Sequence, residues 1–349
     1  MTSKADWNVA IIGGGISGAS AGQQLSQRGA SVTVFDKGRG PGGRCATRRH
    51  ESYSFDHGAQ YFTAHDPRFR RQVAAWATEG TVARWRPRIG ELTPAGYEPT
   101  RQKKMWVGTP GMNAIGRAML EPLDTHFGSL ITSIDHDEQG WSLRDREGQS
   151  YGRYDQLLVT VPAPQVGPFL GDHFSEASDA SNHAKMLPCW SLMLAFDQPI
   201  DLPFDAAKAA GSGPIGWLAR NSSKPGRSSN GMDCWVVQAD HEWSRGHVEL
   251  SMQQALDKLL NDFARVCAMC GVAFTGPVHA DAHRWRYALA TPDAAQDHML
   301  NANKGLAVAG DWLAGGRIET AWLSGLAAAE TLTANRFEQT PALAGATPR

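Results

Sequence analysis

A glycine-rich turn between two apolar segments constrains the fold of this chain more than any other feature. Residues 9–12 are continuously apolar, as expected for a central parallel strand. Gly13, Gly15 and Gly18 follow, and residues 16–28 predict a helix that ends at a glycine. Residues 31–35 predict a second strand, closed by Asp36. Together these segments predict a β-α-β unit of the Rossmann type.

The spacing of the three glycines indicates a dinucleotide site. Gly13 permits the tight turn, Gly15 lets the backbone approach a pyrophosphate, and Gly18 lets the helix pack on the strand. The helix N-terminus adds free N–H groups and a partial positive charge. Asp36 is placed to accept hydrogen bonds from ribose hydroxyls, which argues against a 2′-phosphate there.

Two further segments favour FAD over NAD as the dinucleotide. Residues 37–44 read KGRGPGGR, so Lys37 and Arg44 flank a glycine-rich loop whose arginines can reach a pyrophosphate; a solvated basic loop is the alternative. Near the other end, Asp311 follows a predicted strand at 305–309 and suits a flavin ribityl hydroxyl. A helix that begins near Arg317 would direct its positive end toward the flavin pyrimidine. Two separated segments that hold one extended cofactor predict FAD.

The chain of 349 residues is longer than most single cores, which predicts an α/β protein with a Rossmann-type FAD-binding domain interleaved with a smaller α+β substrate domain. Further helices are expected over 67–77, 251–267 and 318–334, and a hairpin over 130–143. We assign the FAD-binding domain to 1–75, 105–165 and 278–336, the substrate domain to 76–104 and 166–277, and a disordered tail to 337–349.

Composition narrows the partners. The formal net charge of −1 provides no field that would recruit nucleic acid or an acidic membrane. No run approaches the ~20 apolar residues needed to cross a bilayer, and the N-terminus lacks a signal-peptide pattern. Five scattered cysteines suit the reducing cytoplasm, and Cys267 with Cys270 is interpreted as structural. The motifs of zinc proteases and the paired ligands of metal sites are not found, so no metal is expected. The basic loop with Arg220 and Lys224 is interpreted as a solvated face, with attraction of a dinucleotide pyrophosphate as the alternative.

Several motifs spread along nearly the whole chain carry a family resemblance. Residues 13–18, 36–37, 42–44, 159–162 and 310–325 resemble the flavin-containing amine oxidase superfamily. Within it, DHGAQYFT at 56–63, WVGxPGM at 106–112, WLARN at 217–221 and AHRWxYA at 282–288 resemble the bacterial renalase family. Cys189 and residues 221–225 depart from that family's pattern, which bears on the side of the pocket more than on the reaction.

The resemblance implies a fold like that of p-hydroxybenzoate hydroxylase and a set of site residues. Around non-covalent FAD it places Ile16, Asp36, Arg44, Gln60, Ile131 and Asp311. Near substrate or flavin it places Tyr61, Phe62, Thr63, Ala64, His65, Cys189, Arg317 and Ile318.

Several of these side chains have two interpretations. Tyr61 and Phe62 form either an aromatic wall for a nicotinamide ring or part of the core. Gln60 binds the flavin or a substrate amide, or lies on the surface. His283 contacts the ring or its carboxamide, or is a satisfied core histidine. Arg317 holds an amide or phosphate, or forms a structural salt bridge.

The resemblance implies oxidation of 2- and 6-dihydro isomers of NAD(P)H to NAD(P)+, with dioxygen reduced to hydrogen peroxide. Hydride leaves a dihydropyridine directly for flavin N5, so alignment is needed but no general base. An amine oxidase or desaturase of the same superfamily is the main alternative. An aromatic hydroxylase is disfavoured because the strand ending at 161 is followed by PAP. A flavin-free carrier of the same fold is the non-enzymatic alternative, against which the intact glycines and acids argue.

Overall fold

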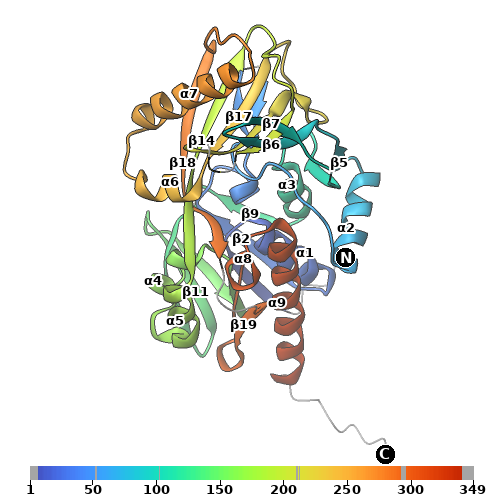
Figure 1. The fold of residues 1–349 in the computed structure, drawn as a ribbon. Coiled ribbons are helices and arrows are strands. Elements are labelled where there is room, and N and C mark those ends of the chain that lie inside the picture. The colour runs from blue at the N-terminus through green and yellow to red at the C-terminus, as the bar shows by residue number, and fades with distance from the viewer. Residues whose placement is uncertain are drawn as a thin grey trace, which may run out of the picture. The chain divides into compact units, whose positions relative to one another are not determined.

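The computed structural model describes residues 7–51, 53–101, 103–209, 211, 213–291 and 296–339, and the chain folds as two compact units. Unit 1 comprises Met1–Pro41, Met119–Ala184 and Pro292–Arg349, and unit 2 comprises Gly42–Ala118 and Lys185–Thr291. The elements of both units are labelled in Figure 1.

Unit 1 is built on a six-stranded sheet in the order β19-β20-β13-β1-β2-β9. Strands β1, β2, β9, β13 and β20 are parallel, and β19 is an antiparallel edge. A separate three-stranded sheet has the order β10-β11-β12. The strands are β1 (Asn8–Ile12), β2 (Ser31–Asp36), β9 (Asp124–Phe127), β10 (Ile131–Asp137), β11 (Gly140–Asp145), β12 (Ser150–Tyr154), β13 (Gln156–Val159), β19 (His298–Asn301) and β20 (Leu306–Ala309).

Helices α1 (Ile16–Gln27) and α9 (Ile318–Gln339) of unit 1 pack closely because small residues line their contact (Figure 1). A Cβ on Gly325 would overlap the carbonyl oxygen of Ser17, and the Ser20 hydroxyl donates to the carbonyl of Trp322 at 2.8 Å. The helices of this unit are α1 (Ile16–Gln27), α4 (Gly167–Leu170), α5 (Ser175–His183), α8 (Asp311–Ala314) and α9 (Ile318–Gln339), with short 3-10 turns at η2 (Ala163–Gln165), η3 (Gly171–His173) and η5 (Ala302–Lys304).

Unit 2 contains a seven-stranded sheet in the order β18-β14-β17-β16-β15-β6-β7 and two small pairs, β3-β4 and β5-β8. Its strands are β3 (Arg48–His50), β4 (Tyr53–Phe55), β5 (Val82–Trp85), β6 (Ile89–Thr93), β7 (Gly96–Pro99), β8 (Met105–Gly108), β14 (Lys185–Phe196), β15 (Ala206–Ala209), β16 (Ile215–Arg220), β17 (Asp233–Ala239) and β18 (His279–Thr291). Its helices are α2 (Pro67–Thr78), α6 (His241–Gly246) and α7 (Met252–Met269), with 3-10 turns at η1 (Gly43–Cys45) and η4 (Asn221–Ser223), and the residues of α3 (Ala114–Leu120) are divided between the two units.

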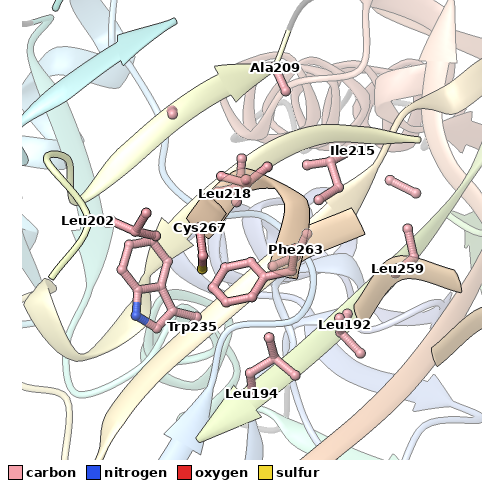
Figure 2. Packing of buried hydrophobic residues seen from close by; sticks show 14 of the residues in the cluster. Leu192, Leu194, Leu202, Ala209, Ile215, Leu218, Trp235, Leu259, Phe263 and Cys267 are labelled. Carbon is pink, nitrogen blue, oxygen red and sulfur yellow. The ribbon is translucent and has the colours of Figure 1, made fainter. Parts of the chain in front are cut away.

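Helix α7 supplies one side of the main core of unit 2. Its sequence sets apolar residues at helical spacing, and Ser251 with Gln254 forms a capping box at its start. Leu259, Phe263 and Cys267 are fully buried against Leu218 and Trp235 of the sheet, as Figure 2 shows. Cys270 packs on the same cluster, and burial raises the pKa of both thiols, which supports the structural interpretation of this cysteine pair.

The compact units do not follow the predicted domain boundaries. Residues 278–291 belong to unit 2 because β18 pairs with β14 along its length, from Lys185↔Thr291 to Ala195↔His279. Residues 42–75 and 105–118 also belong to unit 2, whereas 166–184 belong to unit 1, where α4 packs against β10. Residues 337–339 continue α9 rather than a disordered tail, and 340–349 lie outside the described residues.

Other expectations changed in detail. The segment 37–44, predicted as a glycine-rich loop, runs into the 3-10 turn η1, and Arg48 and Arg49 shortly after it belong to β3. The predicted β-α-β unit, the hairpin of β10 with β11 and the long helices are confirmed at nearly the expected residues. Within the part of the chain that the structure describes, no helix has the length and apolar character to cross a membrane.

Candidate functional site

The carboxyl ends of four parallel strands bring the predicted nucleotide-binding residues of unit 1 to one sheet edge. The register aligns Ile12 with Phe35 and with Val159, and Val159 with Val308. Gly13, Asp36, Thr160 and Asp311 lie at or just beyond these strand ends. Strand β1 lies between β2 and β13, so the chain reverses its strand order here, and ligands of open α/β sheets bind at such a point.

The three glycines of the turn are required for different reasons. Gly13 has φ +114°, and a Cβ there would lie 2.6 Å from the hydroxyl of Thr160. A Cβ on Gly18 would overlap the carbonyl oxygen of Gly13. A Cβ on Gly15 would have no heavy atom of the described residues within 4 Å. The protein itself therefore requires Gly13 and Gly18, whereas the space at Gly15 fits a ligand that approaches the backbone.

The N-terminus of α1 fits an anionic ligand. Gly15 is its N-cap and offers no side-chain cap, and the first turn contains no acidic residue. The hydroxyl of Ser17 is buried there without a hydrogen-bond partner among the described residues. Uncapped N–H groups and the helix dipole favour a phosphate at this position, so these residues fit the predicted dinucleotide.

Asp36 shapes the loop around this helix end. Its carboxylate accepts 2.6 Å hydrogen bonds from the backbone N–H groups of Gly14 and Gly38. Burial raises the pKa of Asp36, although both hydrogen bonds act in the opposite direction. Each oxygen keeps a lone pair for a ribose hydroxyl. The Lys37 ammonium group donates a 3.0 Å hydrogen bond to the side-chain oxygen of Gln165 at the protein surface, so it is engaged outside this loop.

The C-terminal part of unit 1 reaches the same sheet edge. Asp311 is buried at the start of α8, and the N–H of Gly310 donates to the Ser324 hydroxyl at 2.8 Å. Ile318 is buried and begins α9. Arg317 is exposed, and its guanidinium forms no ion pair with the described residues, which is contrary to the salt-bridge interpretation. Ile131 is buried at the start of β10.

In unit 2, the segment Gly58–Tyr61 is held by buried hydrogen bonds. The Gln60 amide donates to the carbonyl oxygens of Asp56 and Gly58, the latter at 3.0 Å, and accepts from Lys224 Nζ at 3.1 Å. Gln60 is 5% exposed, so the surface interpretation was wrong. The backbone passes so close to Arg44 that a Cβ on Gly58 would overlap its carbonyl oxygen. The Arg44 guanidinium lies 3.4 Å from the carbonyl oxygen of Ala288.

Tyr61 and Phe62 point in different directions, so they do not form one aromatic wall. The ring of half-buried Tyr61 lies 5.4 Å from that of Trp217. Phe62 is 4% exposed, and its ring lies 5.9 Å from that of Phe69. This geometry favours the core interpretation for Phe62 and leaves Tyr61 as the candidate for substrate contact. Burial raises the pKa of Tyr61.

The next residues turn outward. Thr63 and Ala64 are half-buried, and His65 is exposed with its Nε2 3.1 Å from the Thr63 hydroxyl. Cys189 is buried instead, and its thiol is directed at the carbonyl oxygen of Ala239 at 3.6 Å. Burial raises the pKa of Cys189 to about 12, so this side chain is a neutral thiol.

His283 belongs to a cluster that sequence spacing did not reveal. The Nδ1 atom of His283 lies 3.2 Å from the guanidinium of Arg48, and Arg48 also forms an ion pair with Asp281. The centroid of the His283 ring lies 4.8 Å from that of the His57 ring. Burial lowers the pKa of His283 to about 4, with Arg48 adding to the effect. Burial, followed by His283 and Arg48, lowers the pKa of His57 to about 3. Both rings are neutral near pH 7.

Strand register places His283 in a row with three side chains that were not among the predicted site residues. Trp217 pairs with Gln238, Gln238 with Ser191, and Ser191 with His283. Directly paired residues share a face of the sheet. Gln238 Nε2 donates to the carbonyl oxygen of Gly58 at 2.7 Å. Among the described residues, the Trp217 indole N–H is buried without a partner. No sequence signal identifies this row, because only the pairing register creates it.

The basic loop was also interpreted wrongly. Lys224 is 2% exposed and pairs with Asp56 at 3.3 Å. Arg220 pairs with Asp233 at 3.1 Å and with Asp205 at 3.7 Å, and it lies over the ring of Trp235. Neither side chain forms a solvated face. Across the described ranges, no cluster of three or more histidines, cysteines or acids has the arrangement of a metal site.

The fold and the glycine turn define a dinucleotide-binding protein of the Rossmann class. Residues 11–76 match the NAD(P)-binding Rossmann-like domain, and residues 98–333 match the flavin containing amine oxidoreductase family. The second match spans more than half of the chain, which therefore belongs to the flavin containing amine oxidoreductase family. FAD is accordingly its cofactor, and the predicted two-domain flavoenzyme fold is confirmed.

Solved structures of similar fold cover almost the entire chain. An Exiguobacterium sp. 255-15 protein assigned as a protoporphyrinogen oxidase has a TM-score of 0.76 at 13% identity, covering 97% of this chain and 100% of its own. Cyclohexylamine oxidase from Brevibacterium oxydans has a TM-score of 0.71 at 12% identity, with 96% and 100% coverage. Putrescine oxidase bound to putrescine has a TM-score of 0.68 at 13% identity, with 94% and 99% coverage.

Proposed function

We propose that this member of the family is an FAD-dependent oxidase of 2- and 6-dihydro isomers of NAD(P)H that yields NAD(P)+ and hydrogen peroxide. The observation that carries the proposal is the segment at 56–63, whose sequence resembles the renalase family and whose Tyr61 packs beside Trp217. An aromatic pair suits a planar dihydropyridine ring. Bound non-covalently, FAD would supply the hydride acceptor and the route for both electrons to dioxygen.

The protein's own residues then need to bind and orient the substrate. Tyr61 and Trp217 offer ring faces for the nicotinamide. Arg317 is exposed without an ion pair among the described residues and offers a charge for an amide or phosphate. His283 is neutral near pH 7 and offers a hydrogen bond to a carboxamide. Oxidation of a dihydropyridine removes no proton by a base, so neutral groups of this kind suffice.

Oxidation of an amine is the alternative within the family. A lysine that acts through water would favour it, and Lys224 is the buried lysine of unit 2. Its ammonium group is engaged by Asp56 at 3.3 Å, by Gln60 at 3.1 Å and by the ring of Trp85 at 5.4 Å. These contacts hold the ammonium group within a buried ion pair, which supports the dihydronicotinamide assignment over the amine.

Anaerobic titration of the yellow protein tests the proposal. We expect 6-dihydro-NAD to bleach the flavin absorbance stoichiometrically, with NAD+ as the product, and readmitted oxygen to restore it with formation of peroxide. Dopamine, spermidine and putrescine serve as matched amine substrates. Fast bleaching by an amine, with none by the dihydronicotinamide, would overturn the assignment. A colourless protein that cannot be reconstituted with FAD would instead indicate the flavin-free carrier. The cytoplasmic location stays a prediction.

A further inference from the structure

A fully buried ion cluster lies under the segment Gly58–Tyr61. The Asp56 carboxylate is 0% exposed and accepts from Arg227 Nε at 3.0 Å and Nη2 at 2.5 Å, and from Lys224 Nζ at 3.3 Å. It also accepts from the Thr47 hydroxyl at 2.8 Å and the Met112 N–H at 2.9 Å. Opposite charges and hydrogen bonds lower its pKa in spite of its burial. Asp56 is therefore a satisfied carboxylate.

The cluster contains one cation more than its charge balance requires. Arg227 donates twice to Asp56 and also to the carbonyl oxygens of Gly108 and Pro225, each at 2.7 Å. This arginine alone neutralises the carboxylate and uses most of its own donors. Burying a second cation is unfavourable. Lys224, whose side chain is 0% exposed, thus needs another reason to be there.

That reason is visible in the second contact of the lysine. Lys224 Nζ donates to Gln60 Oε1 at 3.1 Å, and Gln60 Nε2 donates back to the carbonyl oxygens of Asp56 and Gly58. The Gln60 side chain thereby fixes the backbone at Asp56 and Gly58, which both precede it. Other anchors are the Ala59 N–H to Arg44 carbonyl bond at 2.9 Å and the Gln238 amide on Gly58. Tyr61 follows directly, and Phe62 after it exchanges two 2.9 Å backbone hydrogen bonds with Trp106.

We propose that Lys224 is a positioning residue that acts through Gln60 to hold the Gly58–Tyr61 segment, and with it the Tyr61 ring, in the orientation that turnover needs. This inference rests on the proposed function, because it takes Tyr61 as a substrate contact. It assigns to Lys224 a role in substrate alignment rather than in proton transfer. A misplacement of such a contact reduces the rate more than the affinity when it alters reactive alignment.

The test uses Lys224→Met, whose unbranched side chain is one atom shorter than lysine and uncharged, so that Asp56 and Arg227 remain as a balanced pair. Gln60→Met removes the relay and leaves the lysine paired, and Lys258→Met on the exposed face of α7 is the matched control. In the holoenzyme we expect Lys224→Met and Gln60→Met each to lower the anaerobic flavin-reduction rate by 10-fold or more, with a smaller change in KM. The double variant should be no slower than the slower single variant.

Hydrogen exchange separates this inference from the proposed function. Peptides that cover residues 57–63 should exchange faster in both variants, whereas peptides from α7 should not change. If the wild-type flavin is not reduced by dihydronicotinamides, the proposed function fails, and unchanged exchange at 57–63 would still overturn the positioning role.

Faster exchange with an unaltered reduction rate, or rate losses that multiply in the double variant, would also overturn the positioning role of Lys224. If Lys224→Met does not fold, a normal rate and exchange in Gln60→Met would overturn it.

Discussion

The hydroxyl of Thr160 donates a 2.8 Å hydrogen bond to the carbonyl oxygen of Gly13, which joins the ends of β13 and β1 at the glycine turn. A Cβ on Gly18 would overlap that same oxygen. The turn is thus closed by the protein on one side, while Gly15 faces open space.

Substitution of the glycines should separate folding from cofactor binding. We expect Gly15→Ala to leave the free energy of unfolding of the apoprotein within ~0.5 kcal/mol of wild type, because its Cβ meets no protein atom among the described residues. Its Kd for FAD should rise at least 10-fold, because the methyl group occupies the space at the α1 N-terminus. Gly18→Ala should instead lower the unfolding temperature of the apoprotein. Flavin titration and thermal unfolding check both, and an unchanged Kd in Gly15→Ala would contradict the pyrophosphate position.

Removal of the buried carboxylate should be severely destabilising. Asp56→Asn leaves Lys224 and Arg227 as two unpaired buried cations, for which a loss of about 3–5 kcal/mol is typical. Urea unfolding measures this loss. The double variant Asp56→Asn/Lys224→Met should recover part of it, because one buried charge is removed. A loss below ~1 kcal/mol in the single variant would show that the cluster is hydrated.

The buried histidines should make stability depend on pH. The pKa of His57 is about 3 in the folded chain and near 6.5 when unfolded, so the unfolded state binds the proton first as the pH falls. The contribution of the neutral His57 ring to the free energy of unfolding is complete above pH 6.5. Below pH 6.5 this contribution is lost progressively, by about 1.4 kcal/mol per pH unit. Urea unfolding at pH 7 and pH 5 should show a flatter pH profile for His57→Gln than for wild type. Parallel profiles would contradict the neutral buried ring.

Thiol reactivity should follow burial. Cys189 is 4% exposed with a pKa of about 12, so iodoacetamide should not label it in the native protein at pH 8. Cys270, which is half-buried, should react first although its pKa is also raised. Mass spectrometry of tryptic peptides resolves the two. Rapid labelling of Cys189 would show that its side chain reaches solvent and would support its predicted place beside the substrate.

Arg317 should contribute to substrate binding and not to stability. Its guanidinium is exposed and forms no ion pair with any residue that the structure describes, so Arg317→Met should leave the unfolding temperature unchanged. The KM for 6-dihydro-NAD should rise about 10-fold, which corresponds to ~1.4 kcal/mol of lost binding. Arg70→Met, at an exposed position of α2, is the control. An equal KM in both variants would remove Arg317 from the site.

The local elements followed from the sequence because their signals are local. The apolar run before Gly13, the glycine at the end of α1 and the helical spacing over 251–267 each predicted an element within a few residues of its observed bounds. The compact units differ from the predicted domain boundaries because β18 pairs with β14, which lies almost a hundred residues earlier in the chain, and no local pattern specifies that pairing.

The sequence by itself determined that this chain forms a glycine-turn dinucleotide fold with an acid at the end of its second strand, because steric space and hydrogen-bonding capacity at those positions belong to the residues themselves. Only the tertiary structure decided that Tyr61 and Phe62 face different neighbours, that Lys224 is buried against Asp56, and that Trp217 shares a sheet face with His283. Those relationships depend on strand register and on which oppositely charged side chains, distant in sequence, form ion pairs. Both are set by packing of the whole chain.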